Sequence, residues 1–467
     1  MKWTFLLCGM IMPVLVFSKT WLVGPGRTYT APSQVSTLVT DGDSVLIDAG
    51  IYKRDVAIWR AHNLSLIGVG GMAHLDAEGT AYGRKAIWVI AGNHARVEHI
   101  AFSNCSVVDM NGAGIRQEGV GLIVRHCLFK DNQNGILAGD NPDSDIVIEH
   151  CEFDRNGAGD GYSHNIYINH VRSLVYQYNY AHHAYYGHEI KSRAHRNVIC
   201  YNRITNEDGD ASYEIDLPNG GPALVLGNVI QQSRFSDNNS IVSYGREGLN
   251  NPGPHNLFFV HNTVVNNEDR GIVLNVQSNA DTVLSANNIF AGILTPLNGL
   301  PKTAIAKNNK AHPDIATFNF NNAAQYDYRL TLLSPVIDSA AILPYTFHGT
   351  SLIPELEYVH PAGFKNRMII QLPDPGAYEW QNLTALKESE ALKAGFRYRA
   401  GDRQLILEVE DGSGPWILTL VDAQGRCCGV IHSESSGIIQ LPELAAGWYA
   451  FGAKGRNQLI RGAFVHF

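Results

Sequence analysis

The sequence predicts an all-β protein in which a solenoid of short parallel strands precedes a small β-sandwich. Three observations lead to this prediction. Hydrophobic residues make up 45% of the 467 residues and charged residues only 17%, so the chain can bury a large core. The 45 glycines, together with many Asn-containing turns, favour frequent chain reversals over long helices. The third observation is an internal repeat.

The repeat is a short apolar segment of the form apolar-x-His/Asn-x-x-Phe/Ile, and neighbouring units lie 24 to 34 residues apart. The units end at Phe102, Phe129, Phe153, Tyr180, Ile204, Ile230, Val264 and Ile289. A period of this length with β-rich segments is typical of a solenoid in which each coil contains three short strands.

Two columns of residues support the stacking of these coils. The position two residues before the end of the unit is occupied by Cys127, Cys151, Asn202, Asn228, Asn262 and Asn287. Equivalent residues of stacked coils lie about 4.8 Å apart, which predicts a ladder of thiols followed by a ladder of amides. We expect free buried thiols rather than a disulfide, because in-register Cβ atoms are too far apart. We also expect His126, His150 and His261 to be buried ladder residues.

These repeats resemble those of right-handed parallel β-helix proteins of the pectate-lyase type. The opening DGDSVLIDAGIY (41–52) and the closing DYRLTLLSPVIDSA (327–340) and DPGAYEW (374–380) share the resemblance. It implies a right-handed parallel β-helix over residues 19–380. That fold hosts lyases, hydrolases, epimerases and non-enzymatic adhesins, so the resemblance implies no single activity.

The two ends of the chain carry different signals. Residues 1–18 are predicted to be a cleaved export signal, because Lys2 precedes an apolar run that is too short to span a membrane. No later segment is predicted to cross a membrane, so we expect a secreted or cell-surface protein.

After a linker at 381–395, short strands separated by turn residues predict a β-sandwich at 396–467. Its segments LTLVDAQGR (418–426) and LPELAAGWYAF (441–451) are similar to carboxy-terminal sorting domains of Bacteroidetes-type secretion systems. That similarity implies the secretion machinery as a partner. The alternative is an ordinary carbohydrate-binding or spacer sandwich.

Three segments of successive coils align and place chemically reactive side chains together. They are HNIYIN (164–169), HEIKSR (188–193) and YEIDL (213–217). Strand alternation predicts that the isoleucines point inward and that the polar residues between them point outward. The residues predicted to point outward are Asn165, Tyr167, Asn169, Glu189, Lys191, Arg193, Glu214 and Asp216.

This patch suits chemistry on a uronic acid, in which removal of the proton beside the sugar carboxylate builds up negative charge. We expect Glu189, Glu214 and Asp216 to hold calcium, because hard carboxylate oxygens are its preferred ligands. The predicted catalytic residues are Lys191 as the base, Arg193 as the charge stabiliser and His188. The predicted substrate-binding residues are Asn165, Tyr167, Asn169, His164, Tyr244 and Arg246. The EIKSR segment resembles the acidic calcium ligands and catalytic Lys and Arg of some β-helix polysaccharide lyases.

The leading hypothesis is therefore a secreted lyase that cleaves an acidic polysaccharide by β-elimination. An epimerase, a glycoside hydrolase using a carboxyl pair, and a non-catalytic glycan-binding or cell-surface protein are the alternatives. The outward charges can equally neutralise one another as ordinary ion pairs. The net charge of −8 and the lack of any basic run disfavour nucleic acid as a partner. We expect a monomer, since the start of the solenoid is predicted to be capped.

Overall fold

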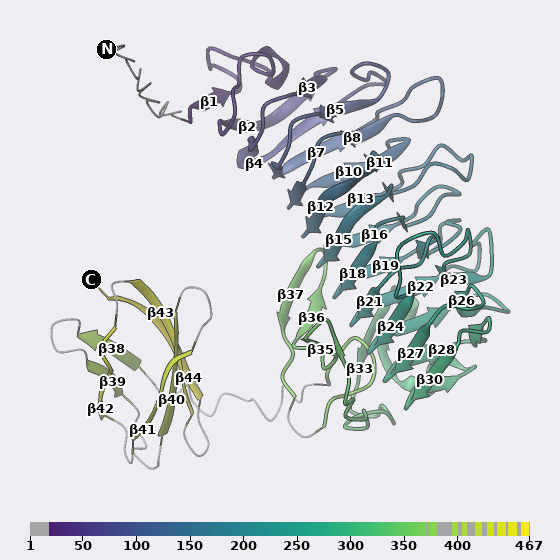
Figure 1. The fold of residues 1–467 in the computed structure, drawn as a ribbon, viewed down its shortest axis with the longest axis vertical. Helices are drawn as coiled ribbons and strands as arrows, with labels where there is room; N and C mark the ends of the chain where they lie inside the picture. Colours follow the sequence, from purple (N-terminus) through teal and green to yellow (C-terminus); the bar gives the residue numbers. More distant parts are fainter. Residues whose placement is uncertain are drawn as a thin grey trace, which may run out of the picture. The chain divides into compact units, whose positions relative to one another are not determined.

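The computed structural model describes residues 18–369 and 372–380, followed by the segments 395–399, 404–408, 416–422, 427–433, 437–444, 447–454 and 459–466. The chain divides into two compact units, Met1–Gln381 and Asn382–Phe467. The first unit contains the stacked strands shown in purple to green in Figure 1.

The first unit is a parallel β-helix in which most coils add one strand to each of three walls. Wall 1 is a ten-strand sheet with every pairing parallel. Its strands are β3 (Ala57–Trp59), β5 (Ala86–Ile90), β8 (Ala113–Gln117), β11 (Asn134–Ala138), β14 (Ile166–Ile168), β17 (Ile190–Ser192), β20 (Ile215–Leu217), β23 (Ser240–Tyr244), β26 (Ile272–Val276) and β29 (Thr295–Asn298).

Walls 2 and 3 together form a continuous sheet of 21 strands. Wall 2 contains β1 (Thr20–Val23), β2 (Ser44–Lys53), β4 (Ser65–Asp76), β6 (Ala95–Glu98), β9 (Leu122–Arg125), β12 (Asn141–Glu149), β15 (Val171–Gln177), β18 (Arg196–Cys200), β21 (Ala223–Leu226), β24 (Asn256–Val260), β27 (Thr282–Ala286) and β30 (Thr303–Lys307). Wall 3 contains β7 (Ile100–Ser103), β10 (Leu128–Lys130), β13 (Glu152–Asp154), β16 (Tyr180–His182), β19 (Arg203–Thr205), β22 (Val229–Gln232), β25 (Thr263–Asn266), β28 (Ile289–Ala291) and β31 (Lys310–His312).

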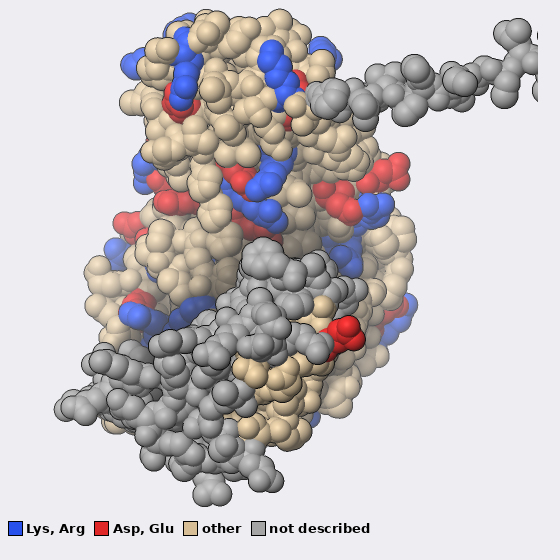
Figure 2. Space-filling model, turned by 90° about the vertical axis from the view of Figure 1, so that its left-hand side faces the viewer, with Lys and Arg blue, Asp and Glu red and all other residues tan. Residues whose placement is uncertain are grey.

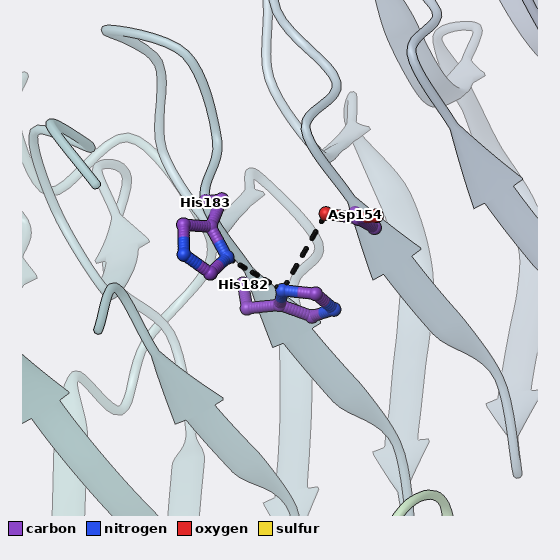
Figure 3. A group of neighbouring side chains, drawn as sticks. All are labelled: Asp154, His182 and His183. Carbon is purple, nitrogen blue, oxygen red and sulfur yellow. Dashed lines mark hydrogen bonds and ion pairs between the residues drawn. The ribbon is translucent and has the colours of Figure 1, made fainter. Parts of the chain in front are cut away.

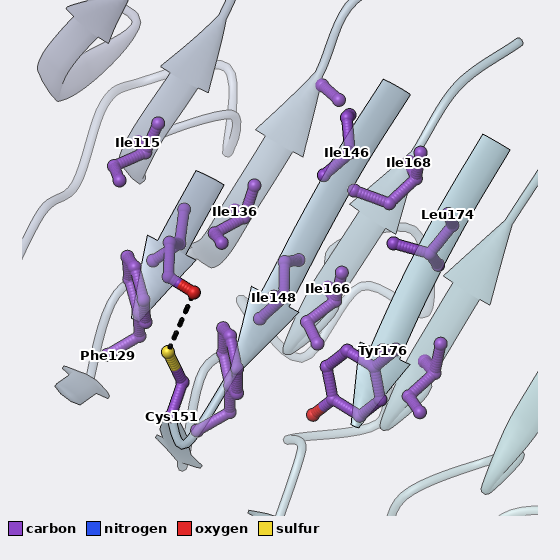
Figure 4. Packing of buried hydrophobic residues seen from close by; sticks show 14 of the residues in the cluster. Ile115, Phe129, Ile136, Ile146, Ile148, Cys151, Ile166, Ile168, Leu174 and Tyr176 are labelled. Atoms are coloured by element: carbon purple, nitrogen blue, oxygen red, sulfur yellow. Dashed lines mark hydrogen bonds between the residues drawn. The ribbon is translucent and has the colours of Figure 1, made fainter. Parts of the chain in front are cut away.

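The interior consists of columns of like residues, one from each coil. Ile115, Ile136 and Ile166 are direct partners along wall 1. On wall 3 the rings of Phe129 and Phe153 stack with centroids 4.8 Å apart. Figure 4 shows these columns converging on a common interior. Each coil therefore buries its apolar face only by lying on its neighbours, as expected for a solenoid.

A ladder of buried asparagines joins the coils at the turn between walls 2 and 3. Each backbone N–H donates to the side-chain oxygen of the next asparagine at 2.8 to 3.1 Å. The ladder contains Asn179, Asn202, Asn228, Asn262, Asn288 and Asn309. Cys127 and Cys151 continue the column at its start, and the prediction that both are free buried thiols is confirmed.

The prediction that Asn287 belongs to the ladder is wrong, and Asn288 takes its place. The pairing of Val264 with Phe290 and of Phe153 with Ala181 shows that the repeat ends one residue later than predicted in two coils. The apolar Ile289 and the aromatic Tyr180 stand directly before the true core positions, so the sequence pattern pointed to the wrong neighbour.

Histidines also stack along this turn, but mostly on the outside. The rings of His99, His126 and His150 lie parallel with centroids 4.9 and 4.7 Å apart. Each occupies a left-handed backbone position, with φ between 51° and 56°. Of the predicted buried histidines only His261 is buried, whereas His126 is exposed and His150 is half-buried. A left-handed residue at this turn directs its side chain away from the interior. His261 is left-handed as well, but its ring is buried against the later part of the chain, where Nδ1 lies 3.1 Å from Asp374 O.

The chain after wall 3 folds back over the β-helix. Its apolar residues Leu343, Phe347 and Leu352 pack on the outer side of wall 2, while Tyr328 and Val336 pack on that of wall 3. This extension contains η2 (Ile315–Phe318), β32 (Phe320–Asn322), η3 (Ala323–Gln325), β33 (Asp327–Leu330), β34 (Thr346–Phe347), β35 (Thr350–Ser351), β36 (Leu356–Val359) and β37 (Gly363–Asn366); a further short turn, η1 (Pro32–Gln34), lies near the start of the chain. Among the described contacts, the extension's two apolar clusters involve walls 2 and 3 and not wall 1.

The second unit consists of two antiparallel sheets. One has the order β38-β39-β42 and the other β41-β40-β43-β44. Their strands are β38 (Gly395–Arg399), β39 (Gln404–Glu408), β40 (Trp416–Asp422), β41 (Cys427–Ser433), β42 (Gly437–Gln440), β43 (Gly447–Lys454) and β44 (Leu459–His466). Ile439 of one sheet and Trp416, Leu418 and Phe451 of the other share a single core, as in a small sandwich.

The predicted fold class, an all-β chain with a right-handed parallel β-helix and a small carboxy-terminal β-sandwich, is confirmed. The predicted export signal lies outside the described residues except for Ser18, and the predicted linker lies outside them as far as residue 394. Within the described residues, no helix has the length and apolar character needed to cross a membrane.

We predict that Asn228→Ala destabilises the β-helix by roughly 2–4 kcal/mol. The Asn228 amide donates to Ile199 O and accepts from Asn202 N, so its removal leaves buried polar groups without partners. Urea unfolding of the variant measures the loss. The exposed Asn298, which donates only to Asn275, provides the control, and equal losses for the two alanine variants would refute a structural role for the ladder.

Candidate functional site

A column of polar side chains crosses the outer face of wall 1. The strand register pairs Tyr167 with Lys191, Lys191 with Asp216, and Asp216 with Ser243. The neighbouring inward residues Ile168, Ile190 and Ile215 are fully buried. Because these strands are parallel and in register, four different side chains from four coils lie in one row about 4.8 Å apart.

Two cations of this face, Lys191 and Arg193, bind one carboxylate, that of Glu247. Glu247 Oε1 accepts from Lys191 Nζ at 2.9 Å, and its Oε2 accepts from Arg193 Nη2 at 2.6 Å. Partial burial alone would raise the pKa of Glu247, but the hydrogen bonds from Lys191 and Arg193 hold that pKa below its ordinary value. The side chains of Lys191 and Arg193 are only 13% and 16% exposed, whereas that of Glu247 is 46% exposed. Glu247 thus covers the two cations from the solvent side.

The loop that carries Glu247 leaves wall 1 directly after β23. Gly245 begins it with φ of 69°, and a Cβ atom there would meet Leu249 Cδ2 at 2.6 Å. Glycine is therefore required for the chain to turn at this point.

Arg193 has further partners beneath the carboxylate. Its Nε donates to the Tyr167 hydroxyl at 3.0 Å, and its Nη1 donates to Asn219 Oδ1 at 2.7 Å. These contacts fix the plane of the guanidinium, so that its remaining N–H groups face outward toward an anion.

Asp216 and two histidines form the floor of the site. Asp216 Oδ2 lies 3.4 Å from Lys191 Nζ and 3.6 Å from His188 Nδ1. Burial raises the pKa of Asp216, although Lys191 acts in the opposite direction. Burial, with help from His164 and Lys191, lowers the pKa of His188 well below its ordinary value, and burial lowers that of His164 to about 3. Both imidazoles are therefore neutral at neutral pH.

The prediction that Asn165, Glu189 and Glu214 point outward is wrong. All three are fully buried. Glu189 accepts from Ala184 N at 3.0 Å and from Asn165 Nδ2 at 2.5 Å, and both oxygens of Glu214 lack a hydrogen-bond partner. These residues stand just before their strands, at the corner where the chain enters wall 1, so strand alternation does not yet apply. The equivalent residues of later coils, Ile241 and Val273, belong to the apolar core.

The other predicted substrate-binding residues, Tyr244, Asn169 and Arg246, also lie apart from the polar column. Tyr244 is also directed inward, since it pairs with Leu217, and its hydroxyl donates to Gly221 O at 2.5 Å. Asn169 accepts from the adjacent His170 N, and the exposed Arg246 donates to Gln277. The structure thus brings together Tyr167, His164, His188, Lys191, Arg193 and Asp216 but not Asn165, Asn169, Tyr244, Arg246, Glu189 or Glu214.

Sequence reasoning missed Glu247, Ser243 and Asn219. Ser243 could have been found by extending the alignment by one coil, because it occupies the outward position next to Asp216. Asn219 lies two residues after the end of β20, where strand alternation no longer places a side chain. Glu247 stands 56 residues after Lys191 on an irregular loop, where no periodicity places a side chain.

The predicted calcium ligands do not form a site. Glu189 and Glu214 are enclosed in the corner of the β-helix, whereas Asp216 is on the outer face beside Lys191. Among the described residues, two groups of acidic and histidine side chains are close enough to hold a cation. One contains Asp338, Asp374 and Glu379, and there the buried Arg367 already neutralises Glu379 at 2.8 Å. The other contains Asp154, His182 and His183.

On the face shown in Figure 2, Lys and Arg side chains are interspersed with Asp and Glu side chains, so this face does not present charge of one sign.

Comparisons with known proteins support the fold. No protein-family model matches the chain, and no curated protein matches it. Among solved structures, the chain is similar to a pectate lyase, Pel9A, with 13% sequence identity and a TM-score of 0.56 over 78% of this chain and 97% of the other. A PL6-family alginate lyase, AlyGC, in a mutant form, shares 14% identity with a TM-score of 0.29 over 70% of this chain and 59% of the other. The first likeness shows that the chain has the parallel β-helix fold of a pectate lyase.

We predict that Glu214→Gln reduces the pH dependence of stability. Burial raises the pKa of Glu214 well above its model-peptide value of 4.5, so the folded protein retains a proton that the unfolded chain releases. The stability contributed by protonated Glu214 is therefore fully present below about pH 4.5 and declines as pH rises toward the folded pKa.

Glutamine at this position stays neutral and removes that decline. From about pH 5 up to the folded pKa of Glu214, the native protein should lose about 1.4 kcal/mol per pH unit relative to the variant. Thermal and urea unfolding across this range measures the difference, and parallel curves for the two proteins would contradict the burial of a protonated Glu214.

Proposed function

We propose that this chain is an exported enzyme that cleaves an acidic, uronic-acid-containing polysaccharide by β-elimination. The observation that carries the proposal is the carboxylate of Glu247 held between Lys191 and Arg193 on the outer face of wall 1. A uronate carboxylate has the same charge and the same two acceptor oxygens. The likeness to the fold of a pectate lyase supports an extended sugar chain as the ligand of such a wall.

The substrate carboxylate would replace Glu247. The Glu247 side chain is nearly half exposed and lies on a loop, so it can leave without disturbing the strands. Lys191 and Arg193 would then neutralise the sugar carboxylate, and this makes the neighbouring proton easier to remove.

We assign the removal of that proton to Tyr167 rather than to Lys191. Lys191 Nζ lies 2.9 Å from Glu247 Oε1 and 3.4 Å from Asp216 Oδ2, so we assign Lys191 to holding a carboxylate rather than to taking a proton. The Tyr167 hydroxyl accepts a hydrogen bond from Arg193 Nε at 3.0 Å, so its oxygen lies beside the cation that would hold the sugar carboxylate. His188 and His164 are buried and would position Asp216 and Tyr167.

The proposed β-elimination uses Tyr167 first as the base and then as the acid. Tyr167, as the phenolate after its hydroxyl proton has left to solvent, takes the proton next to the sugar carboxylate. The electrons of that C–H bond form a C=C bond, and the bond to the leaving sugar oxygen breaks. The protonated Tyr167 returns the proton to that oxygen when both lie on the same face of the sugar. No step is assigned to calcium, because Glu189, Glu214 and Asp216 do not converge.

The apolar start of the chain supports export, and the second unit supports attachment to a secretion system through a sorting domain at 396–467. We keep the organisation predicted from the sequence, with a signal at 1–18, a β-helix at 19–380 and a linker at 381–395, and we propose a monomer.

We predict that the purified mature chain releases products with ultraviolet-absorbing unsaturated ends from alginate, pectate or a glycosaminoglycan. Tyr167→Phe should lower kcat by about 10²- to 10⁴-fold, because it removes the base. Lys191→Ala should raise KM by about tenfold or more, because a charge-assisted hydrogen bond is lost, and should also lower kcat, because the sugar carboxylate is less well neutralised. Lys302→Ala, which breaks the exposed pair with Asp281, is the matched control and should change neither constant.

Other outcomes would redirect the proposal. Reducing ends without ultraviolet absorption would indicate a hydrolase, a changed sugar composition without cleavage an epimerase, and binding alone a glycan-binding protein. Full activity of Tyr167→Phe would refute the assignment of the base.

We also predict that Glu247→Ala binds polygalacturonate or alginate several-fold more tightly than the native chain, because the competing carboxylate is gone. Isothermal titration calorimetry measures the affinity, and Glu78→Ala, which breaks the exposed pair with Lys53, is the control. Weaker binding by Glu247→Ala would show that Glu247 contacts the substrate instead of standing in for it.

A further inference from the structure

A second group of polar side chains converges at the end of wall 3. Asp154 and His182 are direct partners on the adjacent strands β13 and β16. His183 follows in a left-handed conformation, with φ of 55°. His182 Nδ1 lies 2.7 Å from His183 Nδ1 and 3.5 Å from Asp154 Oδ1. Figure 3 shows the two rings and the carboxylate directed toward one another.

The outer nitrogens of both rings are occupied by carboxylates. His182 Nε2 lies 3.3 Å from Glu152 Oε1, and His183 Nε2 lies 3.0 Å from Asp208 Oδ1. An ionised carboxylate can only accept hydrogen bonds, so each Nε2 carries the ring proton. A neutral imidazole has one N–H, and both Nδ1 atoms are therefore left as lone-pair acceptors.

Asp154 adds a third acceptor to this pair. Its Oδ2 accepts from Arg155 Nη2 at 2.6 Å and is 3.2 Å from Lys130 Nζ, so this oxygen is satisfied. Its Oδ1 is buried and has no hydrogen-bond partner, and Asp154 as a whole is only 5% exposed. Three acceptors thus lie within 4.8 Å of one another with no donor between them. Such an arrangement is costly unless a cation lies among them.

We propose that Asp154 Oδ1, His182 Nδ1 and His183 Nδ1 bind one divalent transition-metal ion of the zinc class. Two imidazole nitrogens and one carboxylate oxygen suit zinc better than calcium, which prefers oxygen ligands alone. The carboxylates of Glu152 and Asp208 behind the two rings complete the carboxylate–histidine–metal arrangement that fixes ligand tautomers.

The spacing of the ligand atoms is compatible with such an ion. Tetrahedral zinc with bonds of about 2.0–2.1 Å places its ligands about 3.3 Å apart. The Asp154–His182 separation of 3.5 Å is close to this value, and the two rings, 2.7 Å apart, need to separate by about half an ångström.

One side of the group faces open space. His183 lines a cavity of about 520 Å³ together with Asp208, Tyr185, Asp131 and Arg155. His183 is the one proposed ligand that lines this cavity, so a fourth ligand such as water would approach the ion from the His183 side. Three protein ligands with an accessible fourth position are typical of zinc sites that bind exchangeable ligands.

The test uses the full-length mature chain, stripped with a chelator and then titrated with Zn²⁺ by calorimetry and with Co²⁺ by visible absorption. We expect one equivalent of either ion, a Co²⁺ spectrum typical of low coordination number, and no displacement by excess Ca²⁺. His183→Ala and Asp154→Asn should abolish the Co²⁺ spectrum, and Asp208→Asn should weaken Zn²⁺ binding by about 10- to 100-fold.

A control variant and a check of folding accompany the metal titrations. His170→Ala, which removes an exposed histidine paired with Asp140, is the control and should bind metal like the native chain. His183 is partly exposed, so its alanine variant should fold even if Asp154→Asn does not, and circular dichroism checks this. The proposal would be overturned if the native chain bound no stoichiometric metal, or if folded His183→Ala bound metal as well as the native chain. In either case, a proton shared between the two Nδ1 atoms would be the cation between the rings. The result is independent of any polysaccharide cleavage.

Discussion

The structure depends on the in-register stacking of parallel coils. The buried asparagines at the turn between walls 2 and 3 find their partners in the adjacent coil, as the chain of hydrogen bonds from Asn179 to Asn309 shows. A shift by one residue would break this ladder and turn apolar side chains outward. The same register lines up outward residues from different coils, so a site on wall 1 is assembled from Tyr167, Lys191 and Asp216 without any of them being close in sequence.

Much of the β-helix could be predicted because its constraint is periodic. The spacing of 24 and 25 residues placed Tyr167, Lys191 and Asp216 in one row, and the strand register agrees. The errors at Tyr180 and Ile289 arose where two apolar residues are adjacent, because hydrophobicity alone does not tell which of the two faces the core. Glu189 and Glu214 were misplaced for a different reason: at the corner before wall 1, two successive residues both face inward, as Ile241 and Val242 also do.

The candidate site was only partly predictable, since its anionic partner comes from an irregular loop. Glu247 neutralises Lys191 and Arg193 from a position that no repeat determines. Burial explains the rest of the correction, because a glutamate among apolar side chains keeps its proton, as the rise in the pKa of Glu189 to about 8 indicates. Two of the three acidic residues that seemed suited to calcium, Glu189 and Glu214, are therefore part of the interior, and the outer face keeps Lys191 and Arg193, which suit a carboxylate.

The most direct test of this account is a crystal structure of the chain with a bound oligogalacturonate or oligoalginate. The account predicts a sugar carboxylate between Lys191 Nζ and Arg193 Nη2, with Glu247 displaced and the sugar's acidic C–H directed toward the Tyr167 hydroxyl. A ligand bound on another wall, or one bound on wall 1 while Glu247 keeps both cations, would contradict it.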